Sequence, residues 1–163
     1  MKKKKVMFIS STGGHLTELF VLEPIFKKYD YYIVTEKTKS TIGLKNKYAG
    51  KISFLVYGTK DKFLVYPFKL LFNVIKSLFI YIKVRPKYIV TTGAHTAGPM
   101  CVIGHLFKSR IIFLESVCNV KTKTVTGSLV YPFADLFVVH WKTMLKNYPK
   151  AVYGGNEEWY LSY

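Results

Sequence analysis

The turn Ser11-Thr12-Gly13-Gly14-His15 has residue types and a spacing that could do chemistry. It follows the apolar run 6–9 and precedes leucines and a phenylalanine at helical spacing. Glycines let a backbone approach a ligand closely because they lack a Cβ. The N–H groups at a helix start favour an anion such as phosphate. His15 would stand at the mouth of this turn, where a base titrating near neutral pH is useful. An ordinary strand-to-helix turn with a surface histidine explains the short pattern equally well.

A second glycine-bearing turn, Gly93-Ala94-His95-Thr96-Ala97-Gly98-Pro99, follows the apolar run 88–92. Glu115 and His140 also stand at the ends of apolar runs. Ligands of parallel α/β sheets bind at the carboxyl ends of the strands. The sequence therefore predicts that both turns, Glu115 and His140 lie at the same edge of a sheet.

The elements that must position these residues alternate between strand and helix along the chain. We expect strands at residues 5–10, 31–35, 52–57, 88–92, 110–114, 136–140 and 151–153. Helices are expected at 16–28, 63–84, 100–107, 127–133 and 142–147, and residues 36–48 read as polar and irregular. This order predicts an α/β fold, a single Rossmann-like domain over 1–163 whose parallel sheet is covered on both faces.

One expected helix, at about 63–85, is more apolar than an ordinary amphipathic helix. Its basic residues recur every seven positions and form one narrow stripe with Asn73 beside it: Lys62, Lys69, Lys76 and Lys83. Part of the remaining apolar surface could pack on the sheet, and the rest needs a lipid or protein partner. We favour a helix lying in the membrane interface, with Lys69, Lys76 and Lys83 reaching phosphates while Phe72 and Phe79 enter the lipid. A buried or partner-covered helix and a spanning helix are the alternatives.

Composition narrows the class of protein. The 163 residues carry a net charge of +16, almost wholly from lysine, and Arg85 and Arg110 are the only arginines. Base-reading proteins favour arginine, whereas lysines suit anionic lipid headgroups; we expect no nucleic-acid partner. The two cysteines fit a reducing compartment. No Asp-x-Asp motif and no zinc-ligand spacing occurs, so we expect neither a metal nor a cofactor.

Three blocks together resemble a known family: residues 11–15, residues 92–99, and the block 115–135, which continues to Trp141. They are similar to the membrane-anchoring, acceptor-side subunit of the two-subunit N-acetylglucosaminyltransferase of dolichol-linked oligosaccharide synthesis. They resemble still more closely its bacterial counterparts in capsular and exopolysaccharide assembly. The third block is the specific one, because Gly-Gly-His alone is common.

The resemblance implies the N-terminal half of a GT-B glycosyltransferase, with the donor-binding half on a separate catalytic chain. It implies transfer from a UDP-sugar to a polyprenyl-diphosphate-linked saccharide, with inversion, at the cytoplasmic face of the cell membrane. It also implies little activity without the partner subunit.

Site residues follow from the same resemblance. His15 is the implied base, and Glu115 either orients the acceptor sugar or binds a backbone N–H structurally. Contacts to the acceptor and its phosphates fall on Thr12, Gly13, Gly14, Gly93, His95, Thr96, Gly98 and Asn119, although His95 could be merely a turn residue. Trp141, Trp159 and Tyr160 could dock the partner, or the terminal aromatics could pack on their own domain.

Two other functions compete with this interpretation. A non-catalytic membrane scaffold for a cytosolic enzyme would share the apolar helix but not the base. A small nucleotide-binding oxidoreductase would use Glu36 as a ribose-binding acid, yet the first turn lacks the G-x-G-x-x-G pattern.

Overall fold

The computed structural model describes residues 3–58 and 66–155. Seven parallel strands form one sheet in the order β3-β2-β1-β4-β5-β6-β7. The strands are β1 (Lys5–Ser10), β2 (Asp30–Lys37), β3 (Ile52–Val56), β4 (Tyr88–Gly93), β5 (Arg110–Leu114), β6 (Leu136–Val139) and β7 (Val152–Tyr153). The predicted α/β fold with a parallel sheet is confirmed.

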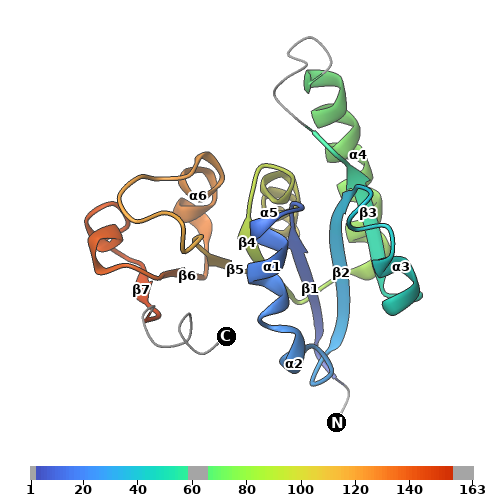
Figure 1. The fold of residues 1–163 in the computed structure, drawn as a ribbon, viewed down its shortest axis with the longest axis horizontal. Coiled ribbons are helices and arrows are strands. Elements are labelled where there is room, and N and C mark those ends of the chain that lie inside the picture. Colours follow the sequence, from blue (N-terminus) through green and yellow to red (C-terminus); the bar gives the residue numbers. More distant parts are fainter. Residues whose placement is uncertain (1–2, 59–65, 156–163) are drawn as a thin grey trace.

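Helices cover both faces of the sheet (Figure 1). One layer contains α1 (Gly14–Phe20), α2 (Glu23–Phe26) and α3 (Leu44–Lys47), and the other contains α4 (Tyr66–Val84), α5 (Ala97–Leu106) and α6 (Val125–Val130). Two 3-10 helices, η1 (Tyr131–Phe133) and η2 (Lys142–Lys146), complete the order. Strand alternation feeds both cores: on β1, Val6 and Phe8 face the α1 layer, whereas Met7 and Ile9 face the α4 layer.

The first predicted helix, at 16–28, is wrong as a single element. The structure divides it into α1 and α2, with Pro24 in the first turn of α2. Proline has no N–H and clashes with the preceding turn inside a helix, but its fixed φ suits a helix start. The irregular segment predicted at 36–48 also differs, because β2 continues through Lys37 and α3 forms one short turn.

The apolar helix α4 packs only part of its circumference on the sheet. Ile80, Tyr81 and Val84 are buried, but its outer side chains are 37% to 74% exposed: Phe68, Leu71, Phe72, Val74, Ile75, Phe79 and Ile82. Asn73, which the sequence places beside the lysine stripe, is buried: it is 3% exposed. Its amide donates to the carbonyl of Val56 and accepts from the N–H of Val56, both at 2.8 Å. This clamp to β3 fixes the rotation of α4, so that the phenylalanines face outward.

Within the part of the chain that the structure describes, none of the helices combines the length and apolar character that a bilayer crossing requires.

Candidate functional site

The two glycine turns meet at the carboxyl edge of the sheet, where β1 and β4 lie side by side. The N–H of Ser11 donates to the carbonyl of Gly93 at 3.0 Å, and the N–H of Ala94 donates to Oγ of Ser11 at 3.2 Å. The order in which strands are added to the sheet changes direction here. β2 and β3 lie on one side of β1, whereas β4 and the strands that follow it lie on the other side. Such a switch point is where α/β sheets usually bind ligands.

Gly13 gives the first turn its shape. Its φ is +81°, in a region that L side chains rarely adopt. Its carbonyl accepts from the N–H groups of Leu16 and Thr17, at 3.0 and 3.1 Å, so α1 begins directly on this turn. Thr12, Gly13 and Gly14 are half-buried to exposed, and a Cβ at either glycine would meet open space. Only the backbone conformation therefore requires glycine at position 13.

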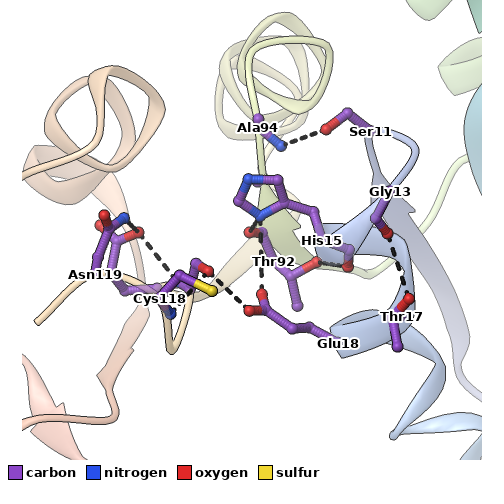
Figure 2. Close-up of polar contacts among 12 residues, drawn as sticks. Ser11, Gly13, His15, Thr17, Glu18, Thr92, Ala94, Cys118 and Asn119 are labelled. Atoms are coloured by element: carbon purple, nitrogen blue, oxygen red, sulfur yellow. Dashed lines mark hydrogen bonds and ion pairs between the residues drawn. The ribbon is translucent and has the colours of Figure 1, made fainter.

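The imidazole of His15 is held by the end of β4, directly before the second turn (Figure 2). Nδ1 lies 2.9 Å from the carbonyl oxygen of Thr92, and the hydroxyl of Thr92 donates to the carbonyl of His15 at 2.7 Å. A carbonyl only accepts, so Nδ1 carries the hydrogen and the neutral ring keeps its lone pair on Nε2. The His15 side chain is 28% exposed. This arrangement presents Nε2 as a proton acceptor.

Glu18 ties His15 to the third sequence block, and the sequence analysis missed it. One carboxylate oxygen lies 3.8 Å from Nδ1 of His15, and the other accepts from the hydroxyl of Ser116 at 2.7 Å. A carboxylate beside an imidazole stabilises the charge that the ring gains when it takes up a proton. The available signal was the i, i+3 spacing of Glu18 from His15, the residue directly before the predicted helix at 16–28.

Glu115 is surrounded by donors from its own domain. It is 2% exposed, and one oxygen accepts from the N–H of Ser116 and the amide of Asn119 at 3.0 and 3.1 Å. The other accepts from the hydroxyls of Thr124 and Tyr148 at 3.0 and 3.1 Å. Burial, followed by the charge of Glu115, raises the pKa of Tyr148 to about 12, so this hydroxyl remains a donor at neutral pH. Of the two roles considered for Glu115, this geometry favours the structural one.

The second turn contributes more packing than open surface. Gly93 has φ +92°, and Gly98 is buried where a Cβ would lie 3.3 Å from Cδ2 of Leu129. His95 is half-buried, and its Nε2 donates to the carbonyl of Gly58 at 3.0 Å. The hydroxyl of Thr96 is buried without a hydrogen-bond partner among the described residues.

The remaining predicted contacts are already engaged within the domain. The indole N–H of Trp141 donates to the carbonyl of Val117 at 2.6 Å, and the ring packs against the larger core. His140 is 8% exposed, with Nδ1 3.2 Å from the carbonyl of Gly155. Trp159 and Tyr160 lie outside the described residues.

Glu36 lies at the carboxyl end of β2, where a ribose-binding acid would stand, but its side chain is buried and already bound to the first turn. Its side chain is 1% exposed at the end of β2, and one oxygen accepts from the N–H of Thr12 at 3.0 Å. Burial raises its pKa, which the N–H groups of Thr12 and Gly58 and the nearby His95 and His15 partly offset. The oxidoreductase interpretation therefore loses its one supporting residue.

Fold comparisons define the class of domain. MurG from Acinetobacter baumannii matches with a TM-score of 0.69 and 16% identity, over 86% of this chain and 42% of that one. A UDP-GlcNAc 2-epimerase from Methanocaldococcus jannaschii matches with a TM-score of 0.67 and 12% identity, over 90% and 42% of the two chains. These identities show a shared fold alone: a Rossmann-like domain equivalent to one half of a GT-B protein.

Sequence comparison shows the family. The profile described as "Oligosaccharide biosynthesis protein Alg14 like" matches residues 58–156, and this chain belongs to that family. Mouse UDP-N-acetylglucosamine transferase subunit ALG14 is 23% identical over 93% of this chain and 82% of its own length. The rat protein of the same name is 31% identical over 54% of this chain, and the human one 33% over 45%. These two alignments span 44% and 37% of the rat and human proteins.

Proposed function

We propose that this chain is the acceptor-side, membrane-associated subunit of a two-chain glycosyltransferase. It binds a polyprenyl-diphosphate-linked saccharide and recruits a donor-binding catalytic partner, which supplies a UDP-sugar. The names of the relatives support UDP-N-acetylglucosamine as the first donor to test. The resemblance of block 115–135 to bacterial counterparts supports capsular or exopolysaccharide assembly as the setting.

The observation that carries the proposal is the orientation of His15. A sugar acceptor hydroxyl must lose its proton as the new glycosidic bond forms, and a positioned base contributes roughly 10²–10⁴-fold to such a step. The Thr92 carbonyl fixes the tautomer of His15, and Glu18 lies ready to stabilise the imidazolium. His15 Nε2 therefore takes the hydroxyl proton while the acceptor oxygen attacks the anomeric carbon and the UDP leaves.

The acceptor phosphates would lie along the first turn. Thr12, Gly13 and Gly14 present backbone at the edge where β1 ends, beside Gly93 of the second turn. Asn119 and Glu115 shape the neighbouring segment rather than contact the sugar, since the Asn119 amide is bound to the Glu115 carboxylate.

Membrane attachment would use the outer face of α4. Phe68, Phe72 and Phe79 are more than half exposed, and Lys76 lies 5.8 Å from the ring of Phe72. Apolar rings beside lysines suit the headgroup boundary of an anionic bilayer, where each lysine contributes about 1 kcal/mol. We place the protein at the cytoplasmic face of the membrane, in a peripheral or interfacial position.

The test is transfer of labelled sugar from UDP-GlcNAc into extractable lipid. Membranes carry a lipid-linked monosaccharide and this chain, with and without the donor-binding partner. We expect label only when both chains are present, and its loss in His15→Ala. Label that needs both chains but ignores His15 would favour the non-catalytic scaffold, and label from the partner alone would refute the proposal.

Membrane binding is tested separately by sedimentation with anionic phosphatidylglycerol vesicles at low salt. We expect the Phe72→Ser/Phe79→Ser double variant to lose most of its vesicle binding while keeping its melting temperature. Val152→Ser is the matched control, because Val152 is 52% exposed on β7, at the opposite edge of the sheet from β3. Unchanged binding of the double variant would exclude α4 as the membrane face.

A further inference from the structure

Glu36 is a buried acid that the proposed mechanism does not use. It lies near the carboxyl end of β2, at the same edge of the sheet as His15, and only 1% of it is exposed. One carboxylate oxygen accepts from the N–H of Thr12 at 3.0 Å, whereas the other is buried with no hydrogen bond of normal geometry among the described residues, and the nearby N–H of Gly58 satisfies it only in part. Burying a carboxyl group with one oxygen incompletely satisfied costs stability. A site that keeps such a group despite its cost calls for a functional explanation.

The position of the Glu36 carboxylate is fixed by its own backbone. Its carbonyl accepts from the hydroxyl of Thr41 at 2.6 Å, and Thr41 is itself 1% exposed. The same hydroxyl accepts from the N–H of Thr38 at 2.9 Å, which closes the turn after β2. These backbone hydrogen bonds therefore hold the Glu36 carboxylate in a fixed position against the N–H of Thr12.

The contact at the Thr12 N–H lies directly before Gly13, the residue that caps the start of α1 at Gly14. Gly13 has φ +81°, and its carbonyl accepts the first helical N–H groups, from Leu16 and Thr17. Glycine can adopt many backbone conformations at similar energy, so a contact from outside the turn is needed to fix the φ and ψ angles of Gly13. A change at Thr12 would rotate the start of α1 and with it the imidazole of His15.

We propose that Glu36 is a positioning residue, which holds the Ser11–Thr12 peptide, directly before Gly13, so that Nε2 of His15 faces the acceptor. The inference rests on the proposed function of His15 as the base. The groups that face Glu36 come from three loops: Thr12 and His15 after β1, Gly58 after β3, and His95 after β4. His95 in turn binds the Gly58 carbonyl, so the acid lies where these loops join.

Two substitutions separate the hydrogen bond from the charge. Glu36→Gln keeps an oxygen for the Thr12 N–H, whereas Glu36→Leu keeps similar bulk and removes it. Thr35→Val is the matched control, because Thr35 is the preceding buried residue of β2 and its hydroxyl has no hydrogen-bond partner among the described residues. The readouts are kcat and acceptor KM of the two-chain complex, and the ¹⁵N resonances of the His15 ring, which report its tautomer without requiring activity.

We expect kcat within about threefold of wild type for Glu36→Gln and Thr35→Val. For Glu36→Leu we expect kcat to fall roughly ten- to a hundredfold, with acceptor KM nearly unchanged, since a small misplacement of a catalytic group has this effect. The His15 resonances should shift toward a mixture of tautomers in Glu36→Leu only. If Glu36→Leu does not fold, Glu36→Asp replaces it, because the shorter side chain withdraws from Thr12.

Several outcomes would overturn the inference. Wild-type kcat in Glu36→Leu would do so, as would equal losses in the Gln and Leu variants with unchanged His15 resonances, which would mean that the charge acts directly. If His15→Ala leaves transfer intact, the base assignment fails by itself. The ring resonances then decide the positioning role alone, and an unchanged His15 tautomer in Glu36→Leu would refute it.

Discussion

His15 and Glu115 stand at the ends of neighbouring parts of the sheet, yet the structure treats them differently. His15 follows β1, keeps 28% of its side chain exposed, and has one ring nitrogen held by the Thr92 carbonyl. Glu115 follows β5, is 2% exposed, and has both oxygens occupied by donors of its own domain. A polar residue at a strand end is available to a ligand only where the fold leaves part of its hydrogen-bonding capacity unused.

The hydrogen-bond donors around Glu115 explain why the residues of the third block, 115–135, form a recognisable pattern. Ser116, Asn119 and Thr124 come from the block itself, and Tyr148 reaches in from after η2. Thr124 also caps α6 by accepting from the N–H of Gly127 at 2.9 Å. One carboxylate thus orders a loop, a helix start and a distant tyrosine. We infer that residues 115–135 determine the shape of this part of the domain, with Glu115 in a structural role.

The largest expected effect is a loss of kcat on substitution of His15. His15→Ala should lower kcat of the two-chain complex by about a hundredfold or more, the usual contribution of a general base. The melting temperature should change little, because the ring is partly exposed and makes one hydrogen bond to the fold. His105→Ala is the matched control, since His105 is exposed and its ring lies tilted against that of Phe133, with ring centroids 4.7 Å apart. Equal losses of kcat in His15→Ala and His105→Ala would contradict a specific catalytic role for His15.

Glu115 should show the reverse pattern, with loss of stability ahead of loss of chemistry. Glu115→Ala leaves the donors of Thr124, Asn119 and Tyr148 without an acceptor, which we expect to lower the free energy of unfolding by ~3 kcal/mol. Denaturant titration of the full chain measures this. At a temperature where the variant remains folded, kcat should fall much less than in His15→Ala. A stable but inactive Glu115→Ala would return Glu115 to a direct catalytic role.

Substitutions of two glycines, Gly127 beside Glu115 and Gly14 beside His15, test the same difference with smaller expected losses of stability. An ideal Cβ on Gly127 would lie 2.5 Å from a Glu115 carboxylate oxygen and 2.7 Å from the Tyr148 hydroxyl, whereas one on Gly14 would meet nothing within 4 Å. Gly127→Ala should therefore cost about 2 kcal/mol of unfolding free energy, and Gly14→Ala should be neutral or slightly stabilising. If Gly14 borders the acceptor phosphates, its alanine variant should instead raise acceptor KM. Comparable stability losses in Gly127→Ala and Gly14→Ala would contradict the structural role assigned to the surroundings of Glu115.

Much of this fold was predictable from the sequence because strand and helix periods alternate clearly. The meeting of both glycine turns at one edge followed from the parallel sheet alone. The division of α1 from α2 was also signalled, by Pro24, but a continuous apolar pattern masked it. The roles of Asn73 and Glu115 could not be predicted, because their partners, Val56 and Tyr148, are 17 and 33 residues away. Hydrogen bonds of such separation depend on tertiary packing and leave no local pattern.

The smallest expected effect concerns a third carboxyl group, Glu36, which lacks the donors that Glu115 has. Burial raises the pKa of Glu36 above its ordinary value of 4.5. The folded protein therefore holds this proton at pH values where the unfolded chain has released it, so ionisation opposes folding. The contribution of Glu36 to the free energy of unfolding should fall as pH rises from about 4.5 through its raised pKa. Glu36→Gln, which cannot ionise, should gain stability relative to wild type across this window.

Glu23 provides the control of opposite sign. Its hydrogen bonds to Lys47 and Tyr48 lower its pKa below 4.5, so its stabilising contribution is present above that pH and is lost as pH falls through the lowered pKa. Denaturant titrations of wild type, Glu36→Gln and Glu23→Gln at several pH values would give the two differences directly. Opposite slopes would show that a carboxyl group at the edge of this sheet carries a cost unless the fold supplies it with donors. Parallel or flat slopes would mean that Glu36 finds an additional donor in solution, and the distinction from Glu115 would then disappear.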